Sequence, residues 1–107
     1  MKRGDLISVS LAGDYGKPRP AIIIQSDDFQ HLESVTVVPL TSNVLSMEAC
    51  RVVLQPTETN GLRETSQVMI DKAGTLPRLK AGPLIGQLSS AEIALVDRAL
   101  AAFLGFA

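Results

Sequence analysis

The sequence is poor in the residues that build cross-links, metal sites and aromatic surfaces. Its 107 residues include one cysteine, one histidine and no tryptophan, and 4% are aromatic. Cys50 has no partner within the chain, so an intrachain disulfide is excluded, and no Cys/His cluster with metal-ligand spacing surrounds His31. We therefore expect no metal and no cofactor, and we expect a reducing, cytoplasmic environment.

The sequence also lacks an excess of basic charge and long apolar runs. The formal net charge is -1 and the pI is about 5.7, which argues against a protein that coats nucleic acid through overall charge. A local basic groove is still compatible with this balance. No apolar stretch resembles a signal peptide or reaches the roughly 20 residues of a membrane span, so no membrane association is expected.

The composition that remains is that of a globular domain, with 46% hydrophobic and 20% charged residues. We predict one domain over residues 1–107, because the chain shows no repeat and no linker. The apolar pattern mostly has a period of two, which predicts strands over 6–11, 21–24, 35–40, 51–55, 67–71 and 84–88. Between them lie a polar excursion at 56–66 with a turn at Asn60-Gly61, and a stretch at 74–83 that we expect to be irregular.

Two strands and one helix carry the clearest patterns. The first strand alternates so that one face is mainly polar, whereas the β-branched run at 21–24 predicts a strand buried on both faces. Ser89-Ser90-Ala91-Glu92 fits a capping box. The helix that follows should cover the open side of the sheet with the apolar face formed by Ile93, Val96, Leu100, Phe103 and Leu104. The fold class is thus mainly β with a C-terminal helix, in a small, strongly bent antiparallel sheet or barrel.

Two strand ends present polar groups. Arg19 stands between Pro18 and Pro20, and two flanking prolines restrict the backbone enough to aim an arginine before a ligand arrives. Thr41 follows the third predicted strand. Read locally, Arg19 is also compatible with an ordinary surface arginine, and Thr41 with a turn residue whose hydroxyl bonds nearby backbone.

These pieces, taken in order, resemble the MazF/PemK family of toxin endoribonucleases over nearly the whole chain. The resemblance rests on Arg3-Gly4-Asp5, Arg19-Pro20-Ala21-Ile22-Ile23, Pro39-Leu40-Thr41-Ser42, Gly61-Leu62, Ser66-Gln67-Val68, Asp71 with Thr75, and the closing apolar helix. It implies a homodimeric SH3-like barrel of the CcdB/PemK type. It also implies metal-independent, sequence-specific cleavage of single-stranded RNA by 2′-OH attack, neutralised by a cognate antitoxin.

The resemblance maps the family's catalytic arginine onto Arg19 and its catalytic threonine onto Thr41. RNA supplies its own nucleophile, so the protein needs to orient the 2′-OH and to stabilise charge on the phosphorane-like transition state. A planar guanidinium suits that second task because it grips two phosphate oxygens at once. We expect electrostatic stabilisation to be the main role of Arg19 and a hydrogen bond to the scissile phosphate to be the role of Thr41.

Further RNA contacts are predicted around this pair. We assign stacking to Tyr15, a phosphate contact to Lys17, and base or sugar contacts to Ser42 and Asn43. Asp71 and Lys72 are also assigned to RNA binding, although many relatives carry Asp-Gln-Ile-Arg-Thr where this chain has Asp71-Lys72-Ala73-Gly74-Thr75. Each of these residues is also compatible with an ordinary solvated loop position.

Three other functions compete with this interpretation. A CcdB-like topoisomerase poison would act through a tryptophan-bearing C-terminus, but this chain ends Phe103-Leu104-Gly105-Phe106-Ala107. An SH3-like adaptor for proline-rich peptides would need an aromatic-lined groove, which the aromatic content disfavours. A catalytically inactive SH3-like scaffold is separated from an enzyme only by an activity measurement.

Overall fold

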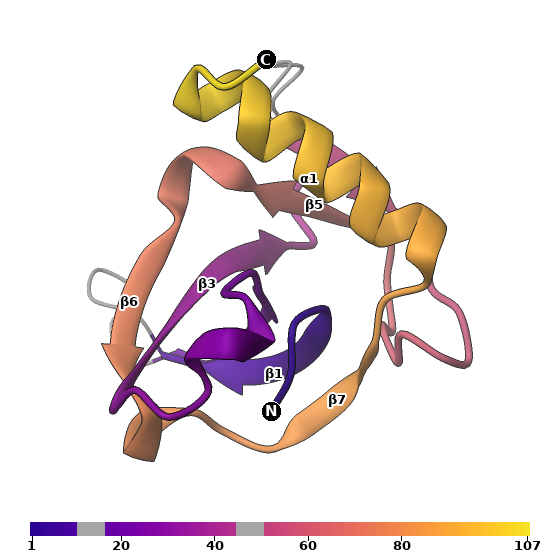
Figure 1. Ribbon diagram of the computed structural model, residues 1–107. Coiled ribbons are helices and arrows are strands. Elements are labelled where there is room, and N and C mark those ends of the chain that lie inside the picture. The colour runs from indigo at the N-terminus through magenta and orange to yellow at the C-terminus, as the bar shows by residue number, and fades with distance from the viewer. Residues whose placement is uncertain (11–16, 45–50) are drawn as a thin grey trace.

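The computed structural model describes residues 1–10, 17–44 and 51–107 (Figure 1). Its strands, in chain order, are β1 (Asp5–Val9), β2 (Arg19–Ile23), β3 (Ser34–Thr41), β4 (Arg51–Leu54), β5 (Ser66–Met69), β6 (Gly74–Pro77) and β7 (Leu84–Gln87). Three short 3-10 helices are η1 (Asp27–Phe29), η2 (Ile70–Lys72) and η3 (Arg78–Lys80), and one α-helix, α1 (Ser90–Leu104), ends the chain.

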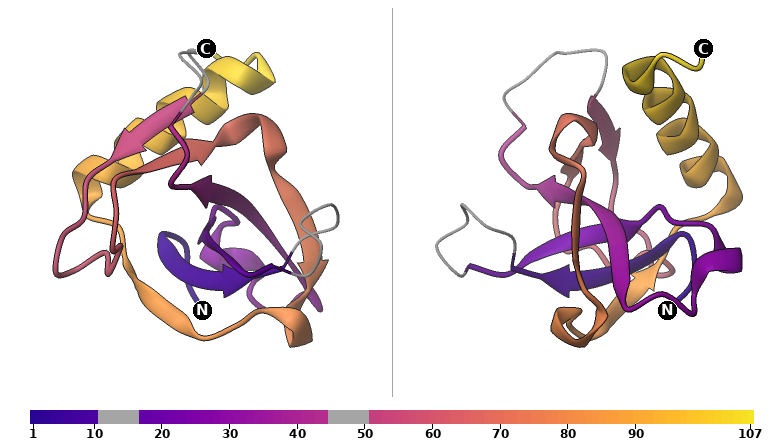
Figure 2. Two further views of the ribbon diagram at one scale, coloured as in Figure 1. Left: turned by 180° about the vertical axis from the view of Figure 1, so that it is seen from behind. Right: turned by 60° about the vertical axis from the view of Figure 1, so that its left-hand side comes forward.

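All strand pairs in the described chain are antiparallel, and the strands run in the order β4-β5-β3-β2-β1-β7. Strand β6 lies off this path and pairs with the first half of β3, from Ser34 opposite Pro77 to Val37 opposite Gly74. The sheet bends around itself, with β6 and β7 forming its outer rim (Figures 1 and 2). The predicted fold class, mainly β with a C-terminal helix, is confirmed.

The central strands are buried on both faces, because the bent sheet encloses one apolar cluster and α1 covers another. Leu6, Ile22, Val38, Leu40 and Val68 pack together with Val96 and Ala99 of α1. The alternate residues Ile7, Val9, Ala21, Ile23, Val35 and Val37 pack with Leu76 of β6. The prediction for 21–24 was therefore right. On the face of the first strand predicted to be mainly polar, Ser8 is half-buried and Ser10 is exposed, but Leu6 is fully buried.

The barrel is closed by a turn instead of a strand ladder. Residues 56–61 reach from β4 to β7, where the Gln87 N–H donates to the Thr59 carbonyl at 2.9 Å. Asn60 holds this turn together: its Oδ1 accepts from the N–H groups of Thr57 and Leu62 at 2.9 and 3.0 Å, and its Nδ2 donates to the Gln55 carbonyl at 2.9 Å and to Glu92 at 3.0 Å. Gly61 takes φ +70°, as the predicted Asn60-Gly61 turn requires.

Helix α1 begins with the predicted capping box. Ser89 Oγ accepts from the Glu92 N–H at 3.1 Å, and the Glu92 carboxylate accepts from the Ser89 N–H at 2.8 Å. The helix lies against the β4–β5 part of the sheet (Figure 1). Its predicted apolar face is only partly buried, because the last turn runs past the sheet and leaves Phe103 49% and Leu104 57% exposed. In the described chain, no helix combines the length and apolarity needed to cross a membrane.

The stretch at 74–83, expected to be irregular, contains β6 and η3 instead. Its regular structure comes from long-range pairing with β3, which a local pattern rich in glycine and proline does not reveal. Arg78 links the end of β6 to the segment before β3. Its backbone N–H donates to the Glu33 carbonyl at 2.7 Å, and its Nε donates to the Leu32 carbonyl at 2.9 Å. The preceding strand is also shorter than predicted, since β5 ends at Met69 and η2 replaces the predicted strand at Ile70 and Asp71.

Candidate functional site

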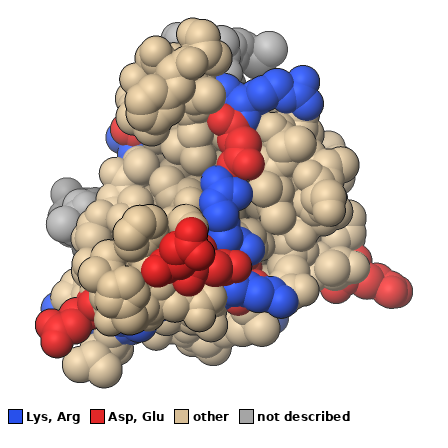
Figure 3. Space-filling view, viewed as in Figure 1, with Lys and Arg blue, Asp and Glu red and all other residues tan. Residues whose placement is uncertain are grey.

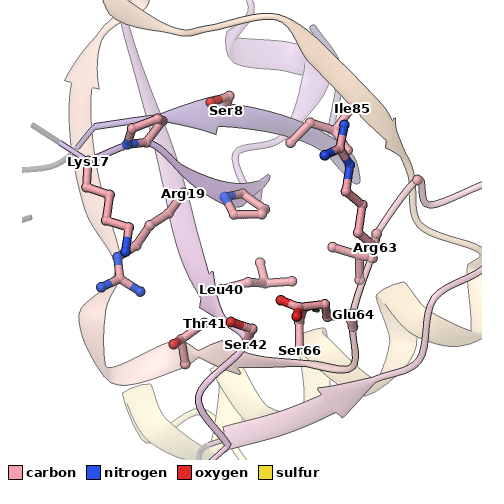
Figure 4. Close-up of a pocket in the computed structure, with 14 residues that line it drawn as sticks. Ser8, Lys17, Arg19, Leu40, Thr41, Ser42, Arg63, Glu64, Ser66 and Ile85 are labelled. Atoms are coloured by element: carbon pink, nitrogen blue, oxygen red, sulfur yellow. Dashed lines mark hydrogen bonds between the residues drawn. The ribbon is translucent and has the colours of Figure 1, made fainter.

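A cavity of about 800 Å³ opens where β1, β2, β3, β7 and the 61–66 segment meet (Figure 4). Its lining residues are Ser8, Lys17, Pro18, Arg19, Pro20, Leu40, Thr41, Ser42, Gly61, Leu62, Arg63, Glu64, Ser66 and Ile85. Four of the predicted site residues, Lys17, Arg19, Thr41 and Ser42, are among them. The cavity therefore brings the two strand ends identified in the sequence to one place.

One wall carries Lys17 and Arg19 where the chain enters β2. Arg19 is the first residue of β2, opposite Val9 of β1, and the next residue, Pro20, also lines the cavity. Arg19 is half-buried and Lys17 is exposed. Two cations on one wall of a concave surface favour an anionic ligand such as a phosphate.

The floor is formed by the end of β3. Thr41 is half-buried, and its Oγ1 accepts a hydrogen bond from the Asn43 N–H at 3.1 Å. The local backbone bond anticipated as the alternative for Thr41 is thus present. A hydroxyl that accepts at one lone pair still has its own O–H to donate, so this turn is compatible with a hydrogen bond from Thr41 to a phosphate oxygen.

The opposite wall is formed by the 61–66 segment. Its charged residues were not predicted as site residues from the sequence. Arg63 and Glu64 line the cavity there, with Ser66 beneath them. In Figure 4 the Arg63 side chain turns toward Ile85, while the Glu64 side chain extends across the cavity toward Ser42. In the sequence, the one signal near Arg63 and Glu64 is their position between Gly61-Leu62 and Ser66. That spacing does not indicate how the loop folds, so it does not predict that the two side chains line the cavity.

The remaining predicted RNA contacts lie apart from the cavity lining. Asn43 is exposed next to Ser42, and Asp71 and Lys72 are exposed on η2. Tyr15 lies outside the described residues, as does Cys50. The structure therefore brings Arg19, Thr41, Lys17 and Ser42 together and places Asp71 and Lys72 at another point of the surface.

Asp71 is engaged by an arginine of the neighbouring strand. Arg51 donates from Nε to Asp71 Oδ1 at 3.0 Å and from Nη2 to Oδ2 at 3.1 Å, while its Nη1 reaches Gln67 Oε1 at 3.4 Å. The hydrogen bonds from Arg51 hold the pKa of Asp71 below its usual value. A second carboxyl, Asp27, has its pKa lowered mainly because it accepts a hydrogen bond from the backbone N–H of Arg3.

The charges of the surface are mixed. Basic and acidic side chains interleave on the face shown in Figure 3, without a broad basic field there. Among the described residues, no group of three or more His, Cys, Asp or Glu side chains is arranged to hold a metal ion. The chemistry available in the cavity is accordingly that of arginine, lysine, hydroxyl and carboxylate side chains.

The sequence and the fold both match known proteins. Residues 2–104 match the family model described as PemK-like, MazF-like toxin of type II toxin-antitoxin system. A probable endoribonuclease MazF from Mycolicibacterium smegmatis is 43% identical over 108 residues, covering 100% of this chain and 99% of that protein. Endoribonuclease MazF9 from Mycobacterium tuberculosis is 28% identical and covers 94% of this chain and 92% of that protein.

Solved structures agree with this relationship. The Mycobacterium tuberculosis toxin MazF-mt6 superposes with a TM-score of 0.80 at 27% identity, covering 96% of this chain and 97% of that chain. An endoribonuclease in complex with its cognate antitoxin, from a mycobacterial species, gives a TM-score of 0.85 at 24% identity over 100% of this chain and 97% of that chain. The second likeness bears on the fold alone. Together the matches favour the toxin endoribonuclease over the CcdB-like and adaptor alternatives.

Proposed function

Since this chain belongs to the PemK-like, MazF-like toxins of type II toxin–antitoxin systems, and is an endoribonuclease of that family, we propose that Arg19 and Thr41 form its catalytic centre. The substrate is single-stranded RNA, cut without a metal ion by attack of the 2′-OH on the adjacent phosphate. Such a substrate places the enzyme in the cytoplasm.

The observation that carries this proposal is the shared cavity of the two residues. Arg19 comes from the start of β2 and Thr41 from the end of β3, and both line the same concave surface (Figure 4). The Arg19 guanidinium binds the non-bridging phosphate oxygens and stabilises the charge that accumulates on them in the transition state. The Thr41 hydroxyl donates to one of these oxygens and holds the phosphate in line for attack.

Neighbouring residues contribute to RNA binding. Lys17 binds a flanking phosphate, and Ser42 and Asn43 contact bases or sugars at the strand end. Tyr15 stacks on a base, and Asp71 with Lys72 provides a second, outlying contact for a longer RNA. The charges of the cavity wall support the Lys17 assignment, and the separate position of η2 makes Asp71 and Lys72 relevant only to RNA that extends beyond the cavity.

The test is cleavage of a long single-stranded RNA in EDTA by the wild-type protein, by Arg19→Ala and by Arg98→Ala. Arg98 is an exposed arginine of α1 outside the cavity lining and serves as the matched control. We expect products with 5′-OH ends from the wild type and the control, and a loss of about 10²-fold or more in Arg19→Ala, because one transition-state contact of this kind is worth that much. Folded wild-type protein that leaves diverse RNAs intact, or equal cutting by Arg19→Ala, would contradict the proposal.

Two protein partners complete the proposal. The first is a second copy of this chain, supported by the apolar end of α1, where Phe103 and Leu104 stay exposed and Phe106 is 83% exposed. Sedimentation should give a dimer at micromolar concentration, and a monomer there would remove this assignment. The second is a cognate antitoxin, which we expect to cover the cationic cavity with an acidic, apolar segment that folds on binding. Inhibition that persists after that segment is deleted would speak against this mode of neutralisation.

A further inference from the structure

We propose that Glu64 is the general base of the cleavage reaction, taking the proton from the attacking 2′-OH. The inference rests on the proposed ribonuclease function and adds a third catalytic residue to Arg19 and Thr41. It concerns a residue that the sequence did not single out and that only the folding of the 61–66 segment brings to the cavity.

The position of Glu64 is the first argument. Glu64 lines the cavity on the wall opposite Arg19, and its side chain extends toward the strand end that carries Thr41 and Ser42 (Figure 4). A phosphate bound between Arg19 and Thr41 therefore has this carboxylate on its other side. A general base must lie within hydrogen-bond reach of the proton that it abstracts, so the proposal requires the ribose beside that phosphate to lie against Glu64.

The chemistry of the cavity is the second argument. Among the described lining residues, Lys17, Arg19 and Arg63 are hydrogen-bond donors without an acceptor atom, and the hydroxyls of Ser8, Thr41, Ser42 and Ser66 are too weakly basic to take a proton. Glu64 is the one carboxylate in that set. It faces these cations, and no hydrogen bond or ion pair joins its carboxylate to another described residue, in contrast to Asp71, which Arg51 engages.

The backbone around Glu64 is held in place. The Ser66 hydroxyl donates to the Glu64 carbonyl at 2.9 Å, and Ser66 itself is buried. On the other side, the buried Leu62 is anchored through its N–H to Asn60 Oδ1 at 3.0 Å. The loop thus holds the backbone of an exposed carboxylate in place at the cavity, which suits a group that must be positioned for proton transfer.

The step is a transesterification. The 2′-oxygen gives its proton to the Glu64 carboxylate and forms a bond to phosphorus, while the bond from phosphorus to the 5′-oxygen breaks. The leaving 5′-oxygen keeps the bonding electron pair and takes a proton from solvent, which gives a 2′,3′-cyclic phosphate and a 5′-OH end. Glu64 then returns its proton to solvent, so no metal and no other reactant is required.

The test compares Glu64→Gln with Glu58→Gln in single-turnover cleavage of a short RNA between about pH 3.5 and 8, a range that includes the usual pKa of a glutamate side chain. Glu58 is an exposed carboxylate of the same excursion that does not line the cavity, so it controls for the loss of one negative charge. We expect Glu64→Gln to lose about 10²- to 10⁴-fold in rate at neutral pH, the usual contribution of a general base. The acid-side inflection of the wild-type pH profile should disappear with it, and Glu64→Asp should recover part of both.

Other outcomes are equally decisive. Full activity of folded Glu64→Gln would overturn the assignment. A rate loss in which the acid-side inflection persists would also overturn it, because Glu64 would then act on substrate placement alone, and an altered cleavage sequence would identify base recognition. Arg19→Ala, measured alongside, separates this inference from the proposed function: if the wild-type enzyme cuts and Arg19→Ala does not, the ribonuclease stands whatever Glu64 does.

Discussion

Arg51 grips both carboxylate oxygens of Asp71, at 3.0 and 3.1 Å, and so ties η2 to the first residue of β4. Arg51 also reaches the buried Gln67, which lies opposite Thr41 in the β3–β5 ladder. A network of polar side chains therefore joins the surface at Asp71 to the strand beside the candidate catalytic threonine. It gives Asp71 a structural role in addition to the RNA contact proposed for it.

The pH dependence of stability follows from this pair. Arg51 lowers the pKa of Asp71 in the folded protein. Asp71 therefore stabilises the fold fully above its unfolded pKa of 3.8, and this stabilisation is lost as the pH falls through the lower pKa of the folded state. Asp71→Asn should cost about 0.5–1 kcal/mol at pH 7, the range for a partly exposed pair, and less near pH 3, where the pH has fallen below the unfolded pKa. Urea unfolding at both pH values checks this, with the exposed Asp28→Asn as control. An equal cost at both pH values would mean that the ion pair is not its source.

Asn60 should be the most sensitive polar residue of the fold. It is fully buried, and Asn60→Ala removes the partners of two backbone N–H groups, one carbonyl and Glu92. We expect a loss of about 3 kcal/mol, because several polar groups lose their partners at once. Cleavage should fall as well, since the turn carries the wall with Arg63 and Glu64. Thermal unfolding gives the measurement, and Asn43→Ala, at an exposed site, should leave stability unchanged.

Gly86 is required where β7 meets the closing turn. A Cβ there would lie 2.4 Å from the Asn60 carbonyl oxygen and 2.5 Å from its carbon, both backbone atoms that cannot swing aside. Gly86→Ala should destabilise the protein by about 2 kcal/mol or more, because the strand and turn must separate. At Gly105, with φ +86° and nothing within 4 Å, the same substitution should cost only about 1 kcal/mol of backbone strain. A comparison of the two melting temperatures tests this order.

The helix cap offers a matched pair of neighbouring serines. Ser89 accepts the hydrogen bond from the Glu92 N–H at 3.1 Å, whereas Ser90 is an exposed first-turn residue. Ser89→Ala should lower the free energy of unfolding by about 1 kcal/mol, and Ser90→Ala should leave it nearly unchanged. Chemical denaturation of both variants decides whether the capping box contributes as its geometry indicates. If the two variants have the same free energy of unfolding, the capping box does not stabilise the helix.

Lys17 should act through charge alone. Lys17→Gln should bind an uncleavable 2′-deoxy oligonucleotide more weakly than the wild type. The slope of the logarithm of the association constant against the logarithm of the salt concentration should become shallower by about 0.7, the value for one phosphate contact to a single strand. Lys80→Gln removes an exposed lysine of η3 that does not line the cavity, and it should leave the slope unchanged. An unchanged slope in Lys17→Gln would show that Lys17 makes no phosphate contact.

Local chemistry explains which parts of the fold were predictable. The capping box at Ser89, the turn at Asn60-Gly61 and the doubly buried strand at 21–24 each follow from short-range patterns whose physical cause lies within a few residues. The predictions that were wrong depend on distant partners. Residues 74–77 form a strand because β3 offers them an edge, and Leu6 is buried because α1 covers its face.

The same division holds for the candidate site and for the protein as a whole. The sequence alone predicted the class of the fold and the family, and it singled out Arg19 and Thr41 as candidates, because prolines and strand ends mark these positions locally and the resemblance maps the family's catalytic pair onto them. Only the tertiary structure decided that the 61–66 segment closes the cavity with Arg63 and Glu64, and that Asp71 is held by Arg51 away from it. The position of a loop depends on the elements that it bridges. Here the buried Asn60 and its close backbone approach to Gly86, 26 residues further along the chain, position the 61–66 segment.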